Sequence, residues 1–232
     1  MDEPSAPIKS GPGLAIFDLD YTLTKRGTWG RFIWGLVRFK PHIWLPMWIH
    51  AGWVQWRYKR GARPRVDVKL AMMRWAMKGA SKNDVLKWGQ AFAQEEVRTG
   101  LRPGAIEAIK KHQSQGDILI IISAAVDVIA KPMGDILGFN FVLSTEMDFD
   151  SQNILKLNFT SKNCYGEEKV IRLNDLMDEN PELKQYNTHV TFYSDSISDL
   201  AMFELATVCI PVHPDERLLQ YASNKGWPIA NW

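Results

Sequence analysis

Two aspartates separated by one residue follow a short apolar run. The run Leu14–Phe17 leads into Asp18 and Asp20. Alternate residues of a β-strand point to the same side, so we expect both carboxylates side by side at the strand's carboxyl end, where open α/β sheets bind ligands. Adjacent carboxylates repel each other, and a hard divalent cation such as Mg²⁺ is the usual means of holding them together. Taken alone, the pair also fits two solvated carboxylates in a strand-to-helix turn.

Other polar side chains stand where further strands are expected to end. Ser123 follows the apolar run 117–122, and Asp195 follows the run 189–193, with Asp199 four residues later. Lys169 opens a predicted helix. Each has a plainer interpretation by itself: a helix-capping serine, two carboxylates at a helix start, and a surface lysine. Together these residue types fit phosphoryl transfer, which needs a nucleophile, a proton donor and positive charge around the phosphoryl oxygens.

The elements that must position these residues alternate between strands and helices after residue 101. Runs rich in β-branched residues predict strands, and apolar residues at helical spacing predict helices. The expected strands are 14–20, 117–122, 141–144, 189–193 and 207–211, and the expected helices are 105–113, 126–137, 168–178 and 200–205. This alternation predicts an α/β fold with a doubly wound parallel sheet.

The stretch between the first two strands has a different composition. Residues 25–102 contain 17 Lys and Arg against 4 Asp and Glu, and eight of the ten tryptophans, whereas the rest of the chain has 11 basic and 22 acidic residues. Helical spacing, as at Val68, Ala71 and Trp75, predicts an all-helical region, with Ser81 as a helix N-cap. The break in composition indicates a separate module.

We therefore divide the 232-residue chain into three parts. Residues 1–13 are polar and rich in proline and glycine, and we expect a disordered lead-in without the apolar core of a secretory signal. Residues 14–27 and 101–232 form the predicted catalytic core. Residues 28–100 form the predicted basic, tryptophan-rich helical cap.

Four short motifs carry a resemblance to a known superfamily. They are Asp18-Leu19-Asp20-Tyr21-Thr22, Ser123, Lys169, and Ser194-Asp195-Ser196-Ile197-Ser198-Asp199. In this order the chain resembles the haloacid dehalogenase-like superfamily, in its phosphoserine-phosphatase-like branch with a helical C1 cap. The resemblance implies a Rossmann-like core and a Mg²⁺-dependent phosphatase that works through an aspartyl phosphate.

The resemblance also implies a role for each residue. Asp18 is the nucleophile and Asp20 the acid and base. Lys169 contacts the phosphoryl group and tempers repulsion among the aspartates. Thr22, Ser123 and Ser196 are phosphate-binding. The implied Mg²⁺ ligands are Asp18, Asp20 through its main-chain carbonyl, Asp195 and, by orienting the metal's water shell, Asp199.

The substrate depends on where the chain departs from phosphoserine phosphatases. The acidic residue expected after the first motif is absent from Thr24-Lys25-Arg26-Gly27, and Ser123-Ala124-Ala125 replaces a Ser-Gly-Gly run. The runs Trp29–Phe32, Gly61–Arg63 and Cys164–Val170 are similar to bacterial phosphatidylglycerophosphate phosphatases. We therefore favour a phospholipid headgroup, with a soluble metabolite phosphate such as histidinol phosphate or phosphoserine as the alternative. Nucleic-acid binding and a phosphomutase role are remote alternatives.

The segment His42–Trp56 bears on location. Residues 41–56 carry no charge and are too short for a confident transmembrane helix, so they form either a buried cap helix or an interfacial segment flanked by basic residues. The two cysteines, Cys164 and Cys209, indicate a reducing compartment. We expect a cytoplasmic protein, with a peripheral position on the inner face of the membrane if the segment is interfacial. The sequence does not set the oligomeric state.

Overall fold

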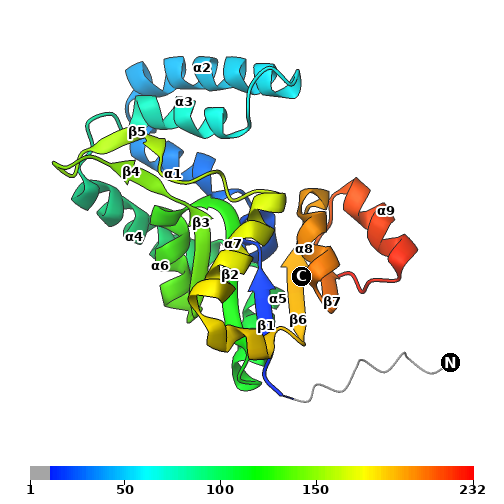
Figure 1. Ribbon diagram of the computed structural model, residues 1–232. Helices are drawn as coiled ribbons and strands as arrows, with labels where there is room; N and C mark the ends of the chain where they lie inside the picture. The colour runs from blue at the N-terminus through cyan, green and yellow to red at the C-terminus, as the bar shows by residue number, and fades with distance from the viewer. Residues whose placement is uncertain (1–10) are drawn as a thin grey trace.

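The computed structural model describes residues 11–232, and most of the predicted lead-in therefore lies outside the described residues. A five-stranded parallel sheet in the order β3-β2-β1-β6-β7 forms the centre of the molecule (Figure 1). Its strands are β1 (Leu14–Phe17), β2 (Ile118–Val126), β3 (Phe141–Thr145), β6 (Val190–Ser194) and β7 (Val208–Pro211). The predicted doubly wound parallel sheet is confirmed.

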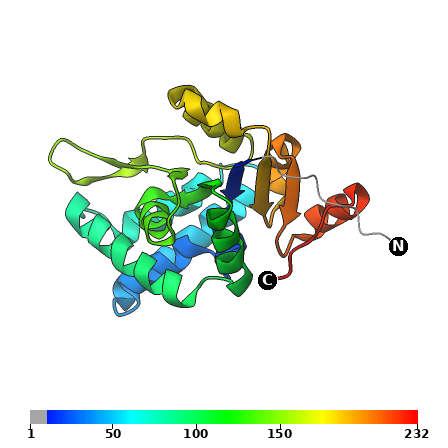
Figure 2. The same cartoon turned by 90° about the horizontal axis from the view of Figure 1, so that it is seen from below.

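Side chains of the central strands alternate between two apolar layers. Ala15 and Phe17 pack with α5 (Pro103–Ser114) and α6 (Asp127–Leu137), whereas Leu14 and Ile16 pack with α7 (Glu167–Glu179), α8 (Leu200–Leu205) and α9 (Glu216–Lys225). Figure 2 shows α7 on one side of the sheet and α5 and α6 on the other. Because helices cover both faces, the strands are apolar runs instead of alternating polar and apolar sequences.

Residues 28–100, within the connection from β1 to β2, contain four helices. They are α1 (Thr28–Val37), α2 (Pro41–Lys59), α3 (Val66–Ala76) and α4 (Lys82–Thr99). The Ser81 side chain accepts a hydrogen bond from the Asp84 N–H at the start of α4, as an N-cap does. Figure 1 shows α2 and α3 beyond the ends of β1 and β6.

Several local features differ from the expectations. The first strand ends at Phe17, so Asp18 and Asp20 do not lie side by side on a pleated strand. β2 continues through Ser123 to Val126 instead of ending at residue 122. α2 runs through Pro46, which removes one helical hydrogen bond without ending the helix. The hairpin of β4 (Met147–Phe149) and β5 (Leu155–Phe159) was not predicted, and neither was α9.

Candidate active site

Asp18 and Asp20 meet at one cavity because the chain turns sharply after β1. Residues 19–23 form one irregular turn, closed by the Thr24 N–H, which donates to the Leu19 carbonyl at 3.0 Å. Tyr21 has a φ of +64°, in the left-handed region that a bulky side chain rarely adopts. This turn, and not strand pleating, brings both carboxylates to the cavity wall.

The cavity lies at the point where the strand order reverses. The chain proceeds from β1 outward through β2 and β3, and then returns to β6 on the other side of β1. Asp18 follows β1 and Asp195 follows β6, so they flank the crevice that such a reversal creates. The cavity encloses about 200 Å³ and is lined by Asp18, Asp20, Tyr21, Arg65, Ser123, Ala124, Tyr165, Lys169, Asp195, Ser196, Ser198 and Asp199.

Lys169 lies in the floor of this site and binds two aspartates. It is only 2% exposed, and its Nζ donates to Asp18 Oδ1 at 2.7 Å and to Asp199 Oδ2 at 2.6 Å. Asp199 Oδ2 also accepts from the Ser194 hydroxyl at 2.7 Å. Burial lowers the pKa of a lysine, but the two carboxylates outweigh burial and raise the pKa of Lys169, which holds it charged.

The pKa values of three carboxyl groups of the site are raised above their ordinary value. Burial, only partly opposed by Lys169, raises the pKa of Asp18 to about 6. Burial, followed by repulsion from Asp18 and Asp199, raises the pKa of Asp195 to about 7. Burial also raises the pKa of Asp20, against the hydrogen bond that its Oδ1 accepts from the Thr28 N–H at 2.8 Å.

The residues present fit a divalent cation. Four aspartates line the cavity with two basic residues, Arg65 and Lys169, which leaves a formal charge of −2 when all are ionised. Oδ1 of Asp199 is buried and has no hydrogen-bond partner in the described part of the chain. Within residues 11–232, no group of three His, Cys, Asp or Glu side chains is arranged as a metal site. Two carboxylates and a main-chain carbonyl do not require such a group.

The predicted phosphate-binding residues differ in position. Ser123 lines the cavity, and its hydroxyl accepts from the Ala125 N–H at 3.2 Å. Ser196 also lines it and lies 3.0 Å from the Ser198 hydroxyl. Thr22 is fully buried beneath the cavity, where its hydroxyl donates to Asp195 Oδ1 at 3.4 Å. Thr22 therefore contacts an aspartate and is not among the residues that line the cavity.

Sequence reasoning missed three residues that line the catalytic cavity or contact its wall. Arg65 and Tyr165 reach the cavity from distant parts of the chain, with the Arg65 guanidinium 4.6 Å from the centre of the Tyr165 ring. Lys69 of α3 donates to the Ala124 carbonyl, beside Ser123, and to Asn163 Oδ1 at 2.8 Å. Charge excess in residues 25–102 was the only signal for the two basic residues, and it does not single them out.

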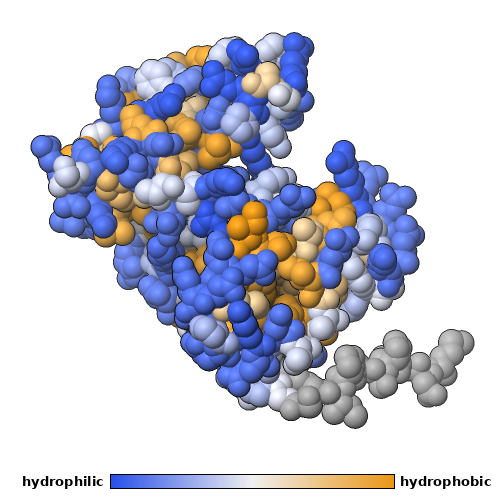
Figure 3. All heavy atoms as spheres, in the orientation of Figure 1, coloured by the Kyte–Doolittle hydropathy of each residue, from blue (hydrophilic) through white to orange (hydrophobic). Residues whose placement is uncertain are grey.

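Figure 3 shows the surface hollowed between the α2–α3 end of the molecule and α8.

Comparison with known proteins agrees with this architecture. A protein named histidinol-phosphatase from Neisseria meningitidis is 26% identical over 230 residues, which cover 94% of this chain and 98% of that protein. The solved structure of a Bordetella pertussis protein of unknown function has a TM-score of 0.81 at 21% identity and covers 96% of this chain and 99% of its own. A phosphoserine phosphohydrolase-like protein from Francisella tularensis has a TM-score of 0.64 at 17% identity, over 94% of both chains. At these identities the two solved structures show a shared fold.

The family model of the haloacid dehalogenase-like hydrolases matches residues 15–204. The match begins at the second residue of β1 and contains the whole helical insertion and the crevice between β1 and β6, including Asp18, Lys169 and Asp199. We conclude that this chain belongs to the haloacid dehalogenase-like hydrolase family.

Proposed function

We propose that the chain is a Mg²⁺-dependent phosphatase that hydrolyses phosphate monoesters through an aspartyl phosphate on Asp18. The observation that carries this proposal is the buried contact of Lys169 with Asp18, at the strand-order reversal and beside Asp20. The ammonium group keeps Asp18 ionised and is placed to receive charge from a phosphoryl group. The name of the Neisseria meningitidis relative supports the same reaction class.

The reaction divides into two displacements at phosphorus. An Asp18 oxygen attacks phosphorus while the bond to the leaving oxygen breaks, and Asp20 donates its proton to that oxygen. Asp20 then removes a proton from a water molecule, whose oxygen attacks phosphorus and releases phosphate from Asp18. The raised pKa of Asp20 suits it to begin this cycle protonated.

Asp18, Asp195 and the main-chain carbonyl of Asp20 would hold Mg²⁺, with Asp199 beside them. When bound, the ion neutralises charge on the phosphoryl oxygens and on the surrounding carboxylates. The formal charge of −2 around the cavity and the unpartnered Asp199 oxygen support this assignment.

Phosphate release by two variants tests the catalytic assignment. Asp18→Asn should abolish turnover of every monoester while the folded state persists in circular dichroism. Asp20→Asn should lose far more activity toward an alkyl phosphate than toward p-nitrophenyl phosphate, because nitrophenolate leaves without a proton. Full activity of Asp18→Asn would refute Asp18 as the nucleophile. Equal losses by Asp20→Asn on both substrates would refute the acid role of Asp20.

We further propose that the substrate is a phospholipid phosphate, such as phosphatidylglycerophosphate, at the cytoplasmic face of a membrane. Support comes from α2, where Leu45, Trp48, Ile49, Trp53 and Trp56 are exposed at helical spacing while Met47, Ala51 and Val54 are buried, although Trp48 and Trp53 also line cavities next to α2. Tryptophan favours the membrane–water interface.

Basic groups accompany this apolar face. The Arg57 guanidinium lies 5.2 Å from the Trp53 ring centre, and that of Arg60 lies 3.9 Å from the Trp56 ring centre. Both can meet anionic headgroups, each with about 1 kcal/mol of attraction. No helix within residues 11–232 has the length and apolar character needed to cross a bilayer. The proposed attachment is therefore peripheral.

A soluble metabolite phosphate is the second candidate, because the histidinol-phosphatase of Neisseria meningitidis aligns along nearly its whole length. Flotation with phosphatidylglycerol-containing vesicles separates the two. We expect the chain to float, and the Trp53→Ala/Trp56→Ala double variant to remain at the bottom with unchanged turnover of p-nitrophenyl phosphate. A wild-type chain that does not float would reject the lipid substrate in favour of the soluble one.

A further inference from the structure

A small cavity between α2 and α3 is separate from the catalytic cavity. It encloses about 100 Å³, and none of the residues that line it also lines the catalytic cavity. Trp53, Arg63 and Arg74 are among its lining residues and are exposed, so the cavity opens on the surface of the helical insertion. We call it the α2–α3 cavity.

Helical spacing explains why α3 contributes to two separate cavities. The α3 wall of the α2–α3 cavity is one stripe of the helix at the spacing i, i+3, i+4 and i+7, made of Asp67, Leu70, Ala71 and Arg74. Lys69 lies on another stripe and contacts Ala124 and Asn163 beside the catalytic cavity. A ligand in the α2–α3 cavity therefore occupies the opposite side of α3 from the catalytic residues.

The α2–α3 cavity carries more positive than negative charge. Arg63 and Arg74 line it, and Asp67 is the one acidic residue among its lining residues, which gives a formal charge of +1. Arg63 Nη1 donates to Asp67 Oδ2 at 3.1 Å, so these two charges neutralise each other. The Arg74 guanidinium has no hydrogen-bond or ion-pair partner within residues 11–232. Arg74 therefore supplies the uncompensated charge.

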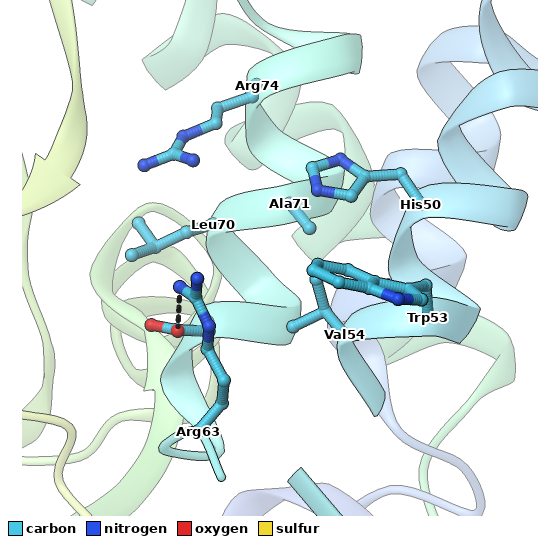
Figure 4. Close-up of a pocket in the computed structure, with 8 residues that line it drawn as sticks. His50, Trp53, Val54, Arg63, Leu70, Ala71 and Arg74 are labelled. Carbon is cyan, nitrogen blue, oxygen red and sulfur yellow. Dashed lines mark hydrogen bonds and ion pairs between the residues drawn. The ribbon is translucent and has the colours of Figure 1, made fainter. Parts of the chain in front are cut away.

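His50 adds a neutral hydrogen-bond donor from α2. The Trp75 indole N–H donates to His50 Nδ1 at 3.2 Å, so the neutral ring carries its proton on Nε2. Figure 4 shows His50 and Trp53 across the cavity from the guanidinium groups of Arg63 and Arg74. Donors thus reach the cavity from α2, from α3 and from the segment that joins them.

We propose that the α2–α3 cavity binds a phosphate group, with Arg74 as its main contact and Arg63 and His50 as further donors. The forked N–H groups of a guanidinium match the oxygens of a phosphate, and Arg63 keeps N–H groups besides the one that it donates to Asp67. The cavity volume is about three times the roughly 30 Å³ that a water molecule occupies in the liquid, which suits a phosphate group and is too small for a nucleoside. This site is additional to the proposed catalytic site and does not depend on it.

Two sources can supply such a phosphate group. One is the headgroup phosphodiester of an anionic phospholipid, and the other is the phosphate of a soluble compound. The lipid is favoured by Trp53, which lines the cavity and belongs to the exposed apolar row of α2. A headgroup held by Arg74 would lie beside a side chain that favours the membrane–water interface.

Titration of the ¹⁵N-tryptophan-labelled protein with inorganic phosphate tests the site. The indole N–H signals of Trp53 and Trp75, assigned with Trp53→Phe and Trp75→Phe, should shift saturably, because Trp53 lines the cavity and Trp75 holds His50. Neither tryptophan lines the catalytic cavity, so phosphate bound at Asp18 does not contact them. Arg74→Met should raise the apparent Kd by at least about tenfold, the loss typical of a hydrogen bond between charged groups.

Arg98→Met is the matched control. Arg74 and Arg98 each lie in the last turn of a helix of the insertion, but Arg98 is paired with Glu95 and does not line the α2–α3 cavity. Arg98→Met should leave the phosphate Kd unchanged. The proposal is overturned if neither indole signal shifts with phosphate, or if Arg74→Met and Arg98→Met bind phosphate equally well.

Turnover of p-nitrophenyl phosphate separates this site from the catalytic one. Arg74→Met should leave that turnover unchanged, and a loss of turnover parallel to the loss of phosphate binding would also overturn the proposal. Failure of the phosphatase proposal has a different signature: the wild type would release no phosphate from p-nitrophenyl phosphate, while the indole shifts would persist.

Flotation with phosphatidylglycerol-containing vesicles distinguishes the two sources. The control is Arg60→Met, which removes an exposed charge stacked on Trp56 and should lower partitioning by about fivefold, the effect of one surface charge. For a lipid headgroup, Arg74→Met should lower partitioning several times more than Arg60→Met. Arg74→Lys, which keeps the charge but loses the fork, should lower it as well. Equal effects of the two methionine variants, or a wild type that does not float, would assign the site to a soluble phosphate compound.

Discussion

Replacing Lys169 by methionine keeps the length of the side chain but removes the charge between two buried carboxylates. The Nζ atom lies 2.7 Å from Asp18 and 2.6 Å from Asp199. At an effective dielectric constant of about 20, each contact is worth about 6 kcal/mol of attraction before the cost of burying the ions is counted. Breaking a buried pair typically costs about 3–5 kcal/mol net. We expect Lys169→Met to lose about that much unfolding free energy at pH 8.

The loss depends on pH in a defined direction. Asp18 already has a pKa raised to about 6, and without the ammonium group that pKa rises further above its unfolded value. The folded variant therefore takes up a proton, as the pH falls, that the unfolded chain does not yet bind. Its deficit relative to wild type should shrink by about 1.4 kcal/mol per pH unit between the raised pKa and pH 6, below which wild-type Asp18 takes up the same proton. The deficit should therefore be smaller at pH 5 than at pH 8.

Urea unfolding of the metal-free proteins at pH 5 and pH 8 measures this effect. The double variant Lys169→Met/Asp199→Asn also removes one of the two carboxylates that lose their cation. It should recover about half of the unfolding free energy that Lys169→Met loses at pH 8. Lys110→Met on the exposed surface of α5 is the control, with a change expected within about 0.5 kcal/mol. Equal deficits of Lys169→Met at both pH values would refute the electrostatic explanation. So would a double variant less stable than the single one.

Three further predictions follow from other contacts. The folded-state pKa values of Asp18 and Asp195 lie above the ordinary value of 3.8, so the metal-free protein loses unfolding free energy as the pH rises from about 4 to 8. Mg²⁺ at about a hundred times its Kd should raise Tm by about 5–10 °C at pH 8. At pH 5 the increase in Tm should be less than half of that. Equal shifts in scanning fluorimetry would contradict competition between Mg²⁺ and protons. Burial lowers the pKa of Lys69 to about 8, so the kcat/KM of the wild type should fall as the pH rises through 8. The kcat/KM of Lys69→Met should show no such step and should be about tenfold lower than that of the wild type at pH 7. A Cβ on Gly89 would lie 1.9 Å from the Val128 carbonyl oxygen, so Gly89→Ala should lower the unfolding free energy measured in urea by about 1–3 kcal/mol. Gly52→Ala, in open space on α2, should raise it by about 0.5–1 kcal/mol. Equal changes in unfolding free energy for the two variants would show that α4 can shift on α6 without cost.

The sheet was predictable because its strands are buried on both sides. Apolar runs such as Leu14–Phe17 and 118–122 have no alternative exposed face, so composition alone identifies them. The hairpin of β4 and β5 lacks this signal, since Lys156 and Asn158 interrupt its apolar pattern. The start of α9 had a usable signal: Asp215 is its N-cap and accepts the Leu218 N–H at 2.9 Å.

Position after a strand accounts for only some of the predicted site residues, because Lys169 and Asp199 were identified from the order of the motifs. The positions of Asp18 and Asp195 are predicted by the apolar strands that directly precede them. The convergence of Asp20 on the same cavity depends on the irregular turn at Tyr21, which strand periodicity does not describe. Arg65 and Lys69 reach the core through the packing of an insertion, and no local pattern distinguishes them from the other basic residues around them.

The position of the insertion has a consequence for how the chain folds. β1 pairs with β2 in the register Leu14 to Ile118, so its partner is synthesised about a hundred residues later. At 5–20 residues per second, β1 waits roughly 5–20 s for that partner. During this interval the helices between them can form from local contacts, but the sheet's centre cannot close. Asp18 and Asp20, directly behind an unpaired apolar strand, then act as charged gatekeepers that limit its association with other nascent chains.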